Sequence, residues 1–141
     1  MEAREYEPLP RPVKALELSE EEKRWDAAMV VWRSARRFQR LAKRLSQAAG
    51  ISFARWQVLD VTERLTREKD DPVSELEVAR AAHLAKSTVS ELMAGLRLQG
   101  LVDIGPDAWG ASYRIWVTRE GEQLVAKLRK QLLDIAGELA R

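Results

Sequence analysis

The chain has 141 residues, of which 45% are hydrophobic and 33% are charged, and its formal net charge is +2. This length suits one domain with a substantial core, and the composition is typical of a soluble globular protein. No apolar run approaches the roughly 20 residues that a membrane-spanning helix needs, and the N-terminus lacks the basic and apolar regions of a secretion signal. We therefore expect a cytoplasmic protein without a membrane partner.

The content of metal-binding and nucleophilic residues excludes several kinds of site. The chain has no cysteine and one histidine, His83. Disulfides, thiolate metal sites and a thiol-oxidation switch are therefore excluded, and a structural zinc or a His-dependent catalytic triad is not expected. We expect no metal and no cofactor, and catalysis would have to depend on carboxylates alone.

The first 50 residues predict an arm followed by a long helix. Residues 1–18 contain Pro8, Pro10 and Pro12 among mixed charges, which predicts an extended arm. Ser19 followed by Glu22 is a capping box that predicts a helix start, and the helix should run to about Gly50. Its apolar positions step by three or four, as one face of a helix requires: Trp25, Met29, Trp32, Ala35, Phe38, Leu41, Leu45 and Ala48.

The second half of this helix carries a run of basic residues with no acidic residue between Arg33 and Arg44. The run comprises Arg33, Arg36, Arg37, Arg40, Lys43 and Arg44. Such a run fits a solvated helix face, a surface that meets phosphates, or the lining of a site for an anionic ligand. The sequence leaves these three interpretations open.

Three further helices are predicted before residue 100. Ser52 caps a helix that extends to about Glu68 and is broken by the segment that ends in Pro72. Residues 74–77 form a second capping box and open a short helix that should end at His83. The next helix runs from near Lys86 to Gln99, where Gly100 suits the left-handed position beyond a helix end.

The pattern then changes to that of a β-hairpin and a final helix. Residues 101–104 and 113–117 are rich in β-branched and aromatic residues, and turn formers lie between them. Thr118 caps a last helix with apolar residues spaced near 3.5, namely Leu124, Val125, Leu128, Leu132, Ile135 and Leu139. A partner helix in a dimer is the better use of this stripe, although part of it also suits an intramolecular core.

Two short helices followed by a hairpin form the order of a winged helix-turn-helix, here over residues 74–118, whose second short helix enters the major groove of DNA. Leu84, Val89, Leu92 and Leu96 are placed to face the core. The expected DNA-binding residues are Ser74, Lys86, Ser87, Thr88, Ser90, Glu91, Arg97 and Arg114. Hydroxyl groups bond base edges or phosphates, Glu91 is able to accept from a cytosine amino group, and Lys86 neutralises a phosphate. The alternative is that residues 86–88 only cap a surface helix.

Several short motifs resemble the multiple-antibiotic-resistance regulator (MarR) family over roughly Ser19 to Arg141. The matching segments are residues 55–59, 86–90, 100–102 and 117–121. The resemblance implies a mainly α fold with a small β-hairpin wing and a homodimer joined by helices at residues 19–50 and 119–141. It also implies two recognition helices on a pseudopalindromic operator, and usually a small-molecule inducer that lowers the affinity for DNA.

The wing departs from the family pattern. That pattern generally has an Asp followed by paired arginines, whereas residues 105–114 here read Gly-Pro-Asp-Ala-Trp-Gly-Ala-Ser-Tyr-Arg. Arg114 is still placed to reach a phosphate from the strand. Trp109 is expected to pack under the wing, with a contact to a sugar as the alternative.

The helix-turn-helix segment departs from the family pattern as well. His83 stands where a turn glycine is usual, which implies a non-glycine residue at positive φ. Ala85 replaces a frequent capping serine, so Ser87 is a candidate cap that would start the helix later. Glu91 stands where a basic residue is common. We therefore expect a shallow salt dependence of DNA binding.

The resemblance also implies a ligand cleft where the two long helices meet, and aromatic residues are crowded on these helices. We predict that Met29, Trp32, Phe53 and Trp56, bordered by Arg36, line a cleft for a small aromatic acid, aldehyde or phenol. Plain core packing is the alternative interpretation of the same residues.

Together these features predict a ligand-responsive repressor that is not an enzyme and that binds double-stranded DNA as a homodimer. A first rival is a winged-helix protein-interaction module without sequence-specific DNA binding. A second rival is an enzyme that uses Asp60 and Glu63, which are neighbours on one helical surface.

Overall fold

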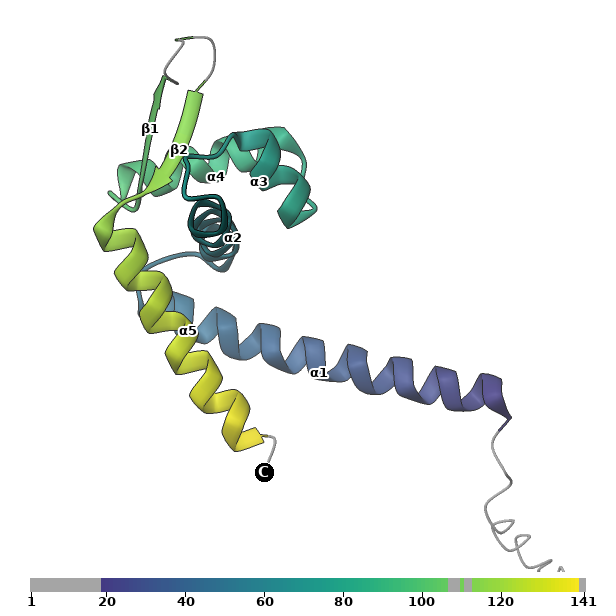
Figure 1. The fold of residues 1–141 in the computed structure, drawn as a ribbon. Helices are drawn as coiled ribbons and strands as arrows, with labels where there is room; N and C mark the ends of the chain where they lie inside the picture. Colours follow the sequence, from purple (N-terminus) through teal and green to yellow (C-terminus); the bar gives the residue numbers. More distant parts are fainter. Residues whose placement is uncertain (1–18, 107–109, 111–112, 140–141) are drawn as a thin grey trace, which may run out of the picture. The chain divides into compact units, whose positions relative to one another are not determined.

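The computed structural model describes residues 19–106, 110 and 113–139. The elements along the chain are α1 (Glu20–Ala48), α2 (Phe53–Lys69), α3 (Glu75–Ala82), α4 (Lys86–Leu98), β1 (Val102–Pro106), β2 (Tyr113–Val117) and α5 (Arg119–Leu139) (Figure 1). The predicted mainly α fold with a small β-hairpin wing is confirmed. The arm at residues 1–18 and Trp109, for which the sequence made predictions, lie outside the described residues.

The helix caps predicted at Ser19, Ser52, Ser74 and Thr118 are confirmed. In each case a hydroxyl oxygen accepts a hydrogen bond from the backbone N–H three residues later, which satisfies a donor that has no partner within the helix. The bonds run from Glu22 to Ser19 (3.2 Å), Arg55 to Ser52 (3.1 Å), Glu77 to Ser74 (3.2 Å) and Gly121 to Thr118 (3.1 Å).

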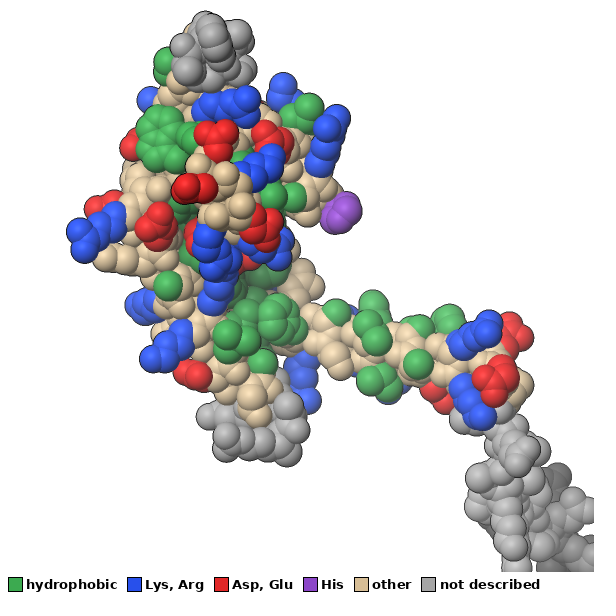
Figure 2. Space-filling model, in the orientation of Figure 1, with side chains coloured by type: hydrophobic (Ala, Val, Ile, Leu, Met, Phe, Trp, Pro, Cys, Tyr) green, Lys and Arg blue, Asp and Glu red, His purple; other side chains and the backbone are tan. Residues whose placement is uncertain are grey.

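The chain divides into two compact units, Met1–Arg37 and Phe38–Arg141, so the boundary falls within α1. In the described part of the first unit, side chains are exposed apart from the partly buried Met29. The exposed side chains include Trp25, Val30, Val31 and Trp32, which retain between 51% and 68% of their accessible surface. Figure 2 shows hydrophobic side chains, in green, exposed along α1.

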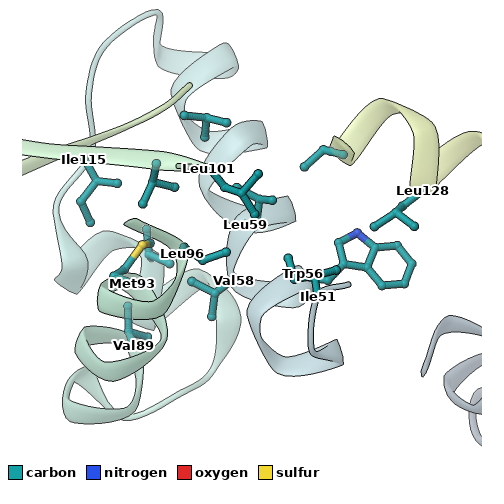
Figure 3. Packing of buried hydrophobic residues seen from close by; sticks show 14 of the residues in the cluster. Ile51, Trp56, Val58, Leu59, Val89, Met93, Leu96, Leu101, Ile115 and Leu128 are labelled. Atoms are coloured by element: carbon teal, nitrogen blue, oxygen red, sulfur yellow. The ribbon is translucent and has the colours of Figure 1, made fainter. Parts of the chain in front are cut away.

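The core of the second unit is built around α2, which packs against α3, α4, β2 and α5. Val58 and Leu59 of α2 are fully buried, as are Met93 and Leu96 of α4 and Ile115 of β2. Figure 3 shows the α4 side chains pointing toward α2, with Leu128 of α5 beside Trp56 on another side of α2. The recognition helix of the predicted motif is therefore seated on α2 by its apolar face.

The wing is an antiparallel pair with the register Val102↔Val117 through Pro106↔Tyr113. The strand β1 continues through Gly105 and Pro106, which the sequence had assigned to the turn. Proline is tolerated there because its pair closes the described ladder, where a missing N–H costs little. Val73, just before α3, forms an isolated antiparallel bridge with Ile115 of β2 through two backbone hydrogen bonds of 2.9 and 2.7 Å.

The wing is joined to α5 by a tight junction. The Thr118 hydroxyl donates to the Gly100 carbonyl at 2.7 Å, and the Thr118 backbone N–H donates to the Leu101 carbonyl at 3.1 Å. Gly121 lies against the same carbonyl, so a Cβ atom there would be 2.2 Å from the Leu101 oxygen. The first turn of α5 is therefore fitted against the start of β1 with no room for a side chain.

Candidate nucleic-acid interface

The turn between α3 and α4 consists of His83, Leu84 and Ala85. His83 has φ 56° and ψ 42°, so the predicted non-glycine residue at positive φ is confirmed. The Leu84 N–H donates to the Ala79 carbonyl at 3.0 Å, which closes the end of α3 in the manner of a left-handed helix cap. Ala79 is 4% exposed, and this small side chain lets the two helices approach.

The recognition helix α4 begins at Lys86. Ala85 occupies the N-cap position with extended angles (φ −65°, ψ 143°), and no side chain among the described residues caps this end. The prediction that Ser87 caps a later start is wrong. Alanine adopts the backbone angles of a cap without a capping oxygen, so Ser87 lies within the first turn.

The outward face of α4 is polar in its first half. Lys86, Ser87, Thr88 and Glu91 are exposed, as are Ala94 and Arg97 further along. The opposite face buries Val89, Met93 and Leu96 completely. Because positions three and four apart share one helical face, Ser87, Glu91 and Ala94 form a single stripe. Five of the eight residues expected to bind DNA, Lys86, Ser87, Thr88, Glu91 and Arg97, are thus exposed on this one helix.

Ser90 has a different environment from the other residues expected at the groove. It is half-buried, and its hydroxyl donates a short hydrogen bond to the carboxylate of Glu75 at the start of α3. The bond joins the two helices of the motif. Sequence reasoning missed Glu75, because a contact across 15 residues leaves no local signal.

Ser74 and Arg114, also expected at the DNA, are brought together by Glu77 of α3. The Glu77 Oε1 atom accepts from the Ser74 hydroxyl at 3.3 Å and from Arg114 Nη1 at 3.2 Å, and its Oε2 atom is paired with Lys69. The hydrogen bond from Lys69 lowers the pKa of Glu77 below its usual value, against the opposing effect of partial burial. One carboxylate therefore holds the end of α2, the cap of α3 and the wing strand β2. The predicted capping box anticipated the Ser74 contact, but nothing in the sequence indicated the other two.

A second ion-pair cluster joins α2 to α5. Arg129 Nε donates to Asp60 Oδ1 at 2.7 Å, and Arg129 Nη2 lies 2.8 Å from Glu63 Oε2. Burial disfavours the charged guanidinium, but the hydrogen bonds and charges of Asp60 and Glu63 outweigh it and raise the pKa of Arg129. The two carboxylates considered as catalytic groups are thus held by one guanidinium.

An apolar cavity of about 360 Å³ lies beside this cluster. Its lining residues are Phe38 and Ala42 of α1, Phe53, Trp56, Gln57 and Asp60 of α2, and Arg129, Leu132, Leu133 and Ala136 of α5. The Phe53 and Trp56 rings meet edge to face with centroids 6.2 Å apart. Trp56 is 5% exposed, and its indole Nε1 is buried without a hydrogen-bond partner among the described residues.

The five residues predicted to bind a ligand are not assembled within one unit. Phe53 and Trp56 line the cavity of the second unit, whereas Met29, Trp32 and Arg36 belong to the first. There the Arg36 guanidinium stacks over the Trp32 ring, 4.9 Å from its centroid.

The charge distribution around the winged motif is mixed. Figure 2 shows Lys and Arg side chains interspersed with Asp and Glu side chains over the wing and its neighbouring helices. A site built on a few defined contacts fits this surface better than one built on broad attraction to phosphates.

No protein-family model and no curated protein matches the sequence. Solved structures do match. A MarR-family regulator from Silicibacter pomeroyi is 22% identical, with a TM-score of 0.68 over 88% of this chain and 81% of that one. MepR, a transcription regulator of the Staphylococcus aureus multidrug efflux pump MepA, is 18% identical, with a TM-score of 0.70 over 80% and 81%.

Two further structures widen this comparison. The S. aureus MepR–DNA complex is 19% identical, with a TM-score of 0.65 over 79% of this chain and 78% of that one. The regulator BldR from Sulfolobus solfataricus is 16% identical, with a TM-score of 0.69 over 86% and 85%. The chain therefore has the winged helix-turn-helix fold of MarR-family transcription regulators, as the sequence motifs predicted. Within the described ranges, none of the helices combines the length and apolarity needed to span a bilayer.

Proposed function

We propose that this chain is a cytoplasmic DNA-binding transcriptional repressor that binds a pseudopalindromic operator as a homodimer. The observation that carries the proposal is the two-sided character of α4. Its apolar face is buried on α2, while its first half presents exposed polar side chains at the start of a helix that follows a helix-turn-helix turn. The existence of a DNA complex of MepR, which has the same fold, supports this reading.

Specific contacts on α4 follow from its exposed residues. Ser87, Thr88 and Glu91 meet base edges, with Glu91 accepting from a cytosine amino group, while Lys86 and Arg97 meet phosphates. The uncapped backbone N–H groups at the start of α4 favour a phosphate there as well. Ser74, Ser90 and Arg114 are engaged with glutamates of α3, and we assign them no contact with a base.

A homodimer is supported by exposed apolar surface on the helices at residues 19–50 and 119–141. In α1 the side chains of Trp25, Val31 and Trp32 are more than half exposed, and in α5 Leu133 is 70% exposed. Most helical stability in proteins comes from packing an apolar face, so these side chains need a partner. Sedimentation at micromolar concentration should show a dimer, and Val31→Lys should convert it to a monomer.

A ligand that releases DNA is the second part of the proposal. The cavity is walled by Phe53 and Trp56, and the buried Trp56 N–H is available to donate to a ligand oxygen. Arg129, which lines the cavity, is already paired with Asp60 and Glu63. A further carboxylate would meet an excess of negative charge there. Small aromatic aldehydes and phenols therefore suit this cavity better than aromatic acids.

The DNA-binding proposal is tested by selecting duplexes from a random library at physiological salt and measuring their affinity. Thr88→Ala and Glu91→Ala should each weaken the selected duplex by about 1 kcal/mol or more, while Gln131→Ala on the exposed face of α5 should change nothing. If no sequence is enriched, the protein-interaction module becomes the better assignment. If a sequence is enriched but both α4 variants bind it unchanged, the contacts assigned to α4 are wrong.

The ligand proposal is tested by thermal shift with benzaldehyde, phenol and benzoate. Trp56→Phe keeps an aromatic ring and removes the N–H donor, so it should reduce the shift that benzaldehyde and phenol cause. Trp116→Phe on β2, which is 40% exposed and does not line the cavity, is the matched control. An equal shift in both variants, or a larger shift with benzoate, contradicts the assignment.

A further inference from the structure

Two cations beside the winged motif are engaged by a single carboxylate. The Glu77 Oε1 atom lies 3.2 Å from Arg114 Nη1, and its Oε2 atom is paired with Lys69. The Ser74 hydroxyl also donates a hydrogen bond to Oε1 at 3.3 Å. We name this set, Lys69, Ser74, Glu77 and Arg114, the Glu77 cluster. The side chains of Lys69, Glu77 and Arg114 are 30% to 51% exposed, so solvent and solutes reach the two cations.

Arg114 is the basic residue of the described strands β1 and β2. A wing cation near the backbone of a duplex would ordinarily bind a phosphate, and each such contact adds affinity that does not depend on sequence. In this structure a carboxylate occupies the place that a phosphate oxygen would take. Because the guanidinium offers the same donors to either anion, Glu77 and the DNA backbone compete for it.

We propose that Glu77 is a specificity-determining residue that withholds Arg114 and Lys69 from the phosphate backbone. This inference rests on the proposed DNA-binding function and deepens it. With the two cations neutralised, binding to arbitrary DNA stays weak, and the contacts of α4 decide which sequence is bound. Glu77 acts through Arg114 and Lys69 and touches no base itself.

A purely structural role for the cluster makes a different prediction from this one. If Glu77 only braced the wing, its removal would loosen β2 and weaken binding to every duplex. If it withholds cations, its removal adds phosphate contacts, and the slope of log affinity against log salt becomes steeper by about 0.9 for each cation released. The salt slope therefore separates the two roles.

The experiment measures salt-dependent binding of the full chain to a mixed-sequence 20-base-pair duplex and to a selected operator. The variants are Glu77→Gln, Arg114→Ala, the double variant, and Glu68→Gln as a control. Glu68 is an exposed glutamate near the same end of α2, and the control changes net charge by the same amount. Thermal unfolding verifies that each variant is folded.

For Glu77→Gln we expect a slope steeper by about one to two units than for Glu68→Gln, and a gain of roughly three- to tenfold in affinity for the mixed duplex at low salt. The ratio of operator affinity to mixed-duplex affinity should fall. Arg114→Ala alone should leave the slope unchanged, and in the double variant it should remove about one unit of the gain.

Equal slopes for Glu77→Gln and Glu68→Gln overturn the proposal, and so does a shallower slope for Arg114→Ala alone. If Glu77→Gln does not fold, Arg114→Ala and Lys69→Ala decide, since unchanged slopes support withholding and shallower slopes refute it. Wild-type protein that binds neither duplex contradicts the DNA-binding function itself, and the inference falls with it. Wild-type binding without the Glu77→Gln effect removes the inference alone.

Discussion

Gly121 offers a sharp test of how the wing is attached to α5. A Cβ atom at this position would lie 2.2 Å from the Leu101 carbonyl oxygen and 2.6 Å from Val117 Cγ1. The first of these neighbours is backbone, and it already accepts the Thr118 N–H at 3.1 Å. The clash cannot be relieved by rotating a side chain, so Gly121→Ala must displace either the first turn of α5 or the start of β1.

The expected magnitude combines two opposing effects. The Cβ contact is more than 1 Å shorter than ordinary van der Waals contact, and such overpacking costs typically 1–3 kcal/mol. Replacing glycine by alanine within a helix returns up to about 1 kcal/mol. We expect a net loss of about 1–2 kcal/mol in the free energy of unfolding. For a chain of this size that corresponds to a fall of roughly 3–8 °C in Tm.

Gly137 in the same helix is the matched control, because it is exposed and a Cβ there meets nothing within 4 Å. Gly137→Ala should raise stability by up to about 1 kcal/mol. Both variants are measured by urea unfolding at one fixed protein concentration, since a dimer makes apparent stability depend on concentration. Equal stabilisation by the two alanines would refute the close approach of Leu101 and Gly121.

Three further predictions concern the turn and the two ion-pair clusters. His83 at φ 56° is in a strained region for a residue with a side chain. In denaturant unfolding, His83→Gly should leave stability unchanged or raise it by up to about 1 kcal/mol, while His83→Val should lower it. The reverse order contradicts the left-handed turn. Arg129→Ala leaves Asp60 and Glu63 without their shared cation and should lower the free energy of unfolding by about 1–2 kcal/mol. Lys130→Ala, at the adjacent exposed position, should lower it little. Equal losses would show that the cluster contributes nothing. Because Lys69 lowers the pKa of Glu77 below 4.5, the carboxylate stabilises the fold above that pH and loses this effect as the pH falls through the lower folded-state pKa. The stability difference between wild type and Glu77→Gln should therefore shrink on acidification. A difference that stays constant with pH would exclude the charged pair.

The features that the sequence predicted correctly depend on local chemistry. The starts of α1, α2, α3 and α5 were marked by hydroxyl residues, and each cap needs only three residues of sequence. The positive φ of His83 was expected because this residue stands where the MarR family usually has a turn glycine. Burial of Val89 and Leu96 against exposure of Ser87 and Glu91 followed from the helical period alone.

The features that the sequence did not predict depend on contacts between distant residues. Arg114 and Glu77 are 37 positions apart, and Arg129 and Asp60 are 69 apart. Their side chains meet only after α2, α3, β2 and α5 have packed. Charge patterning within one helix marks neighbours three or four residues away and gives no sign of such pairs. Sequence analysis therefore treated both side chains as unpaired. It expected Arg114 to contact a phosphate and named Asp60 as a catalytic group of the rival enzyme.

The position of α2 gives the proposed ligand a route to the recognition helix. One side of α2 contributes Trp56 to the cavity, while Val58 and Leu59 are buried in the core that α4 also enters. Arg55 on the same helix donates to Gln99 at the end of α4 at 3.0 Å, and its guanidinium fills the space left by Gly95. Since packed cores change between discrete arrangements more readily than they deform smoothly, a ligand that fills the cavity and shifts Trp56 should move α2 together with α4. Replacing Gly95 by a residue large enough to displace Arg55 should therefore abolish the loss of operator affinity that the ligand causes.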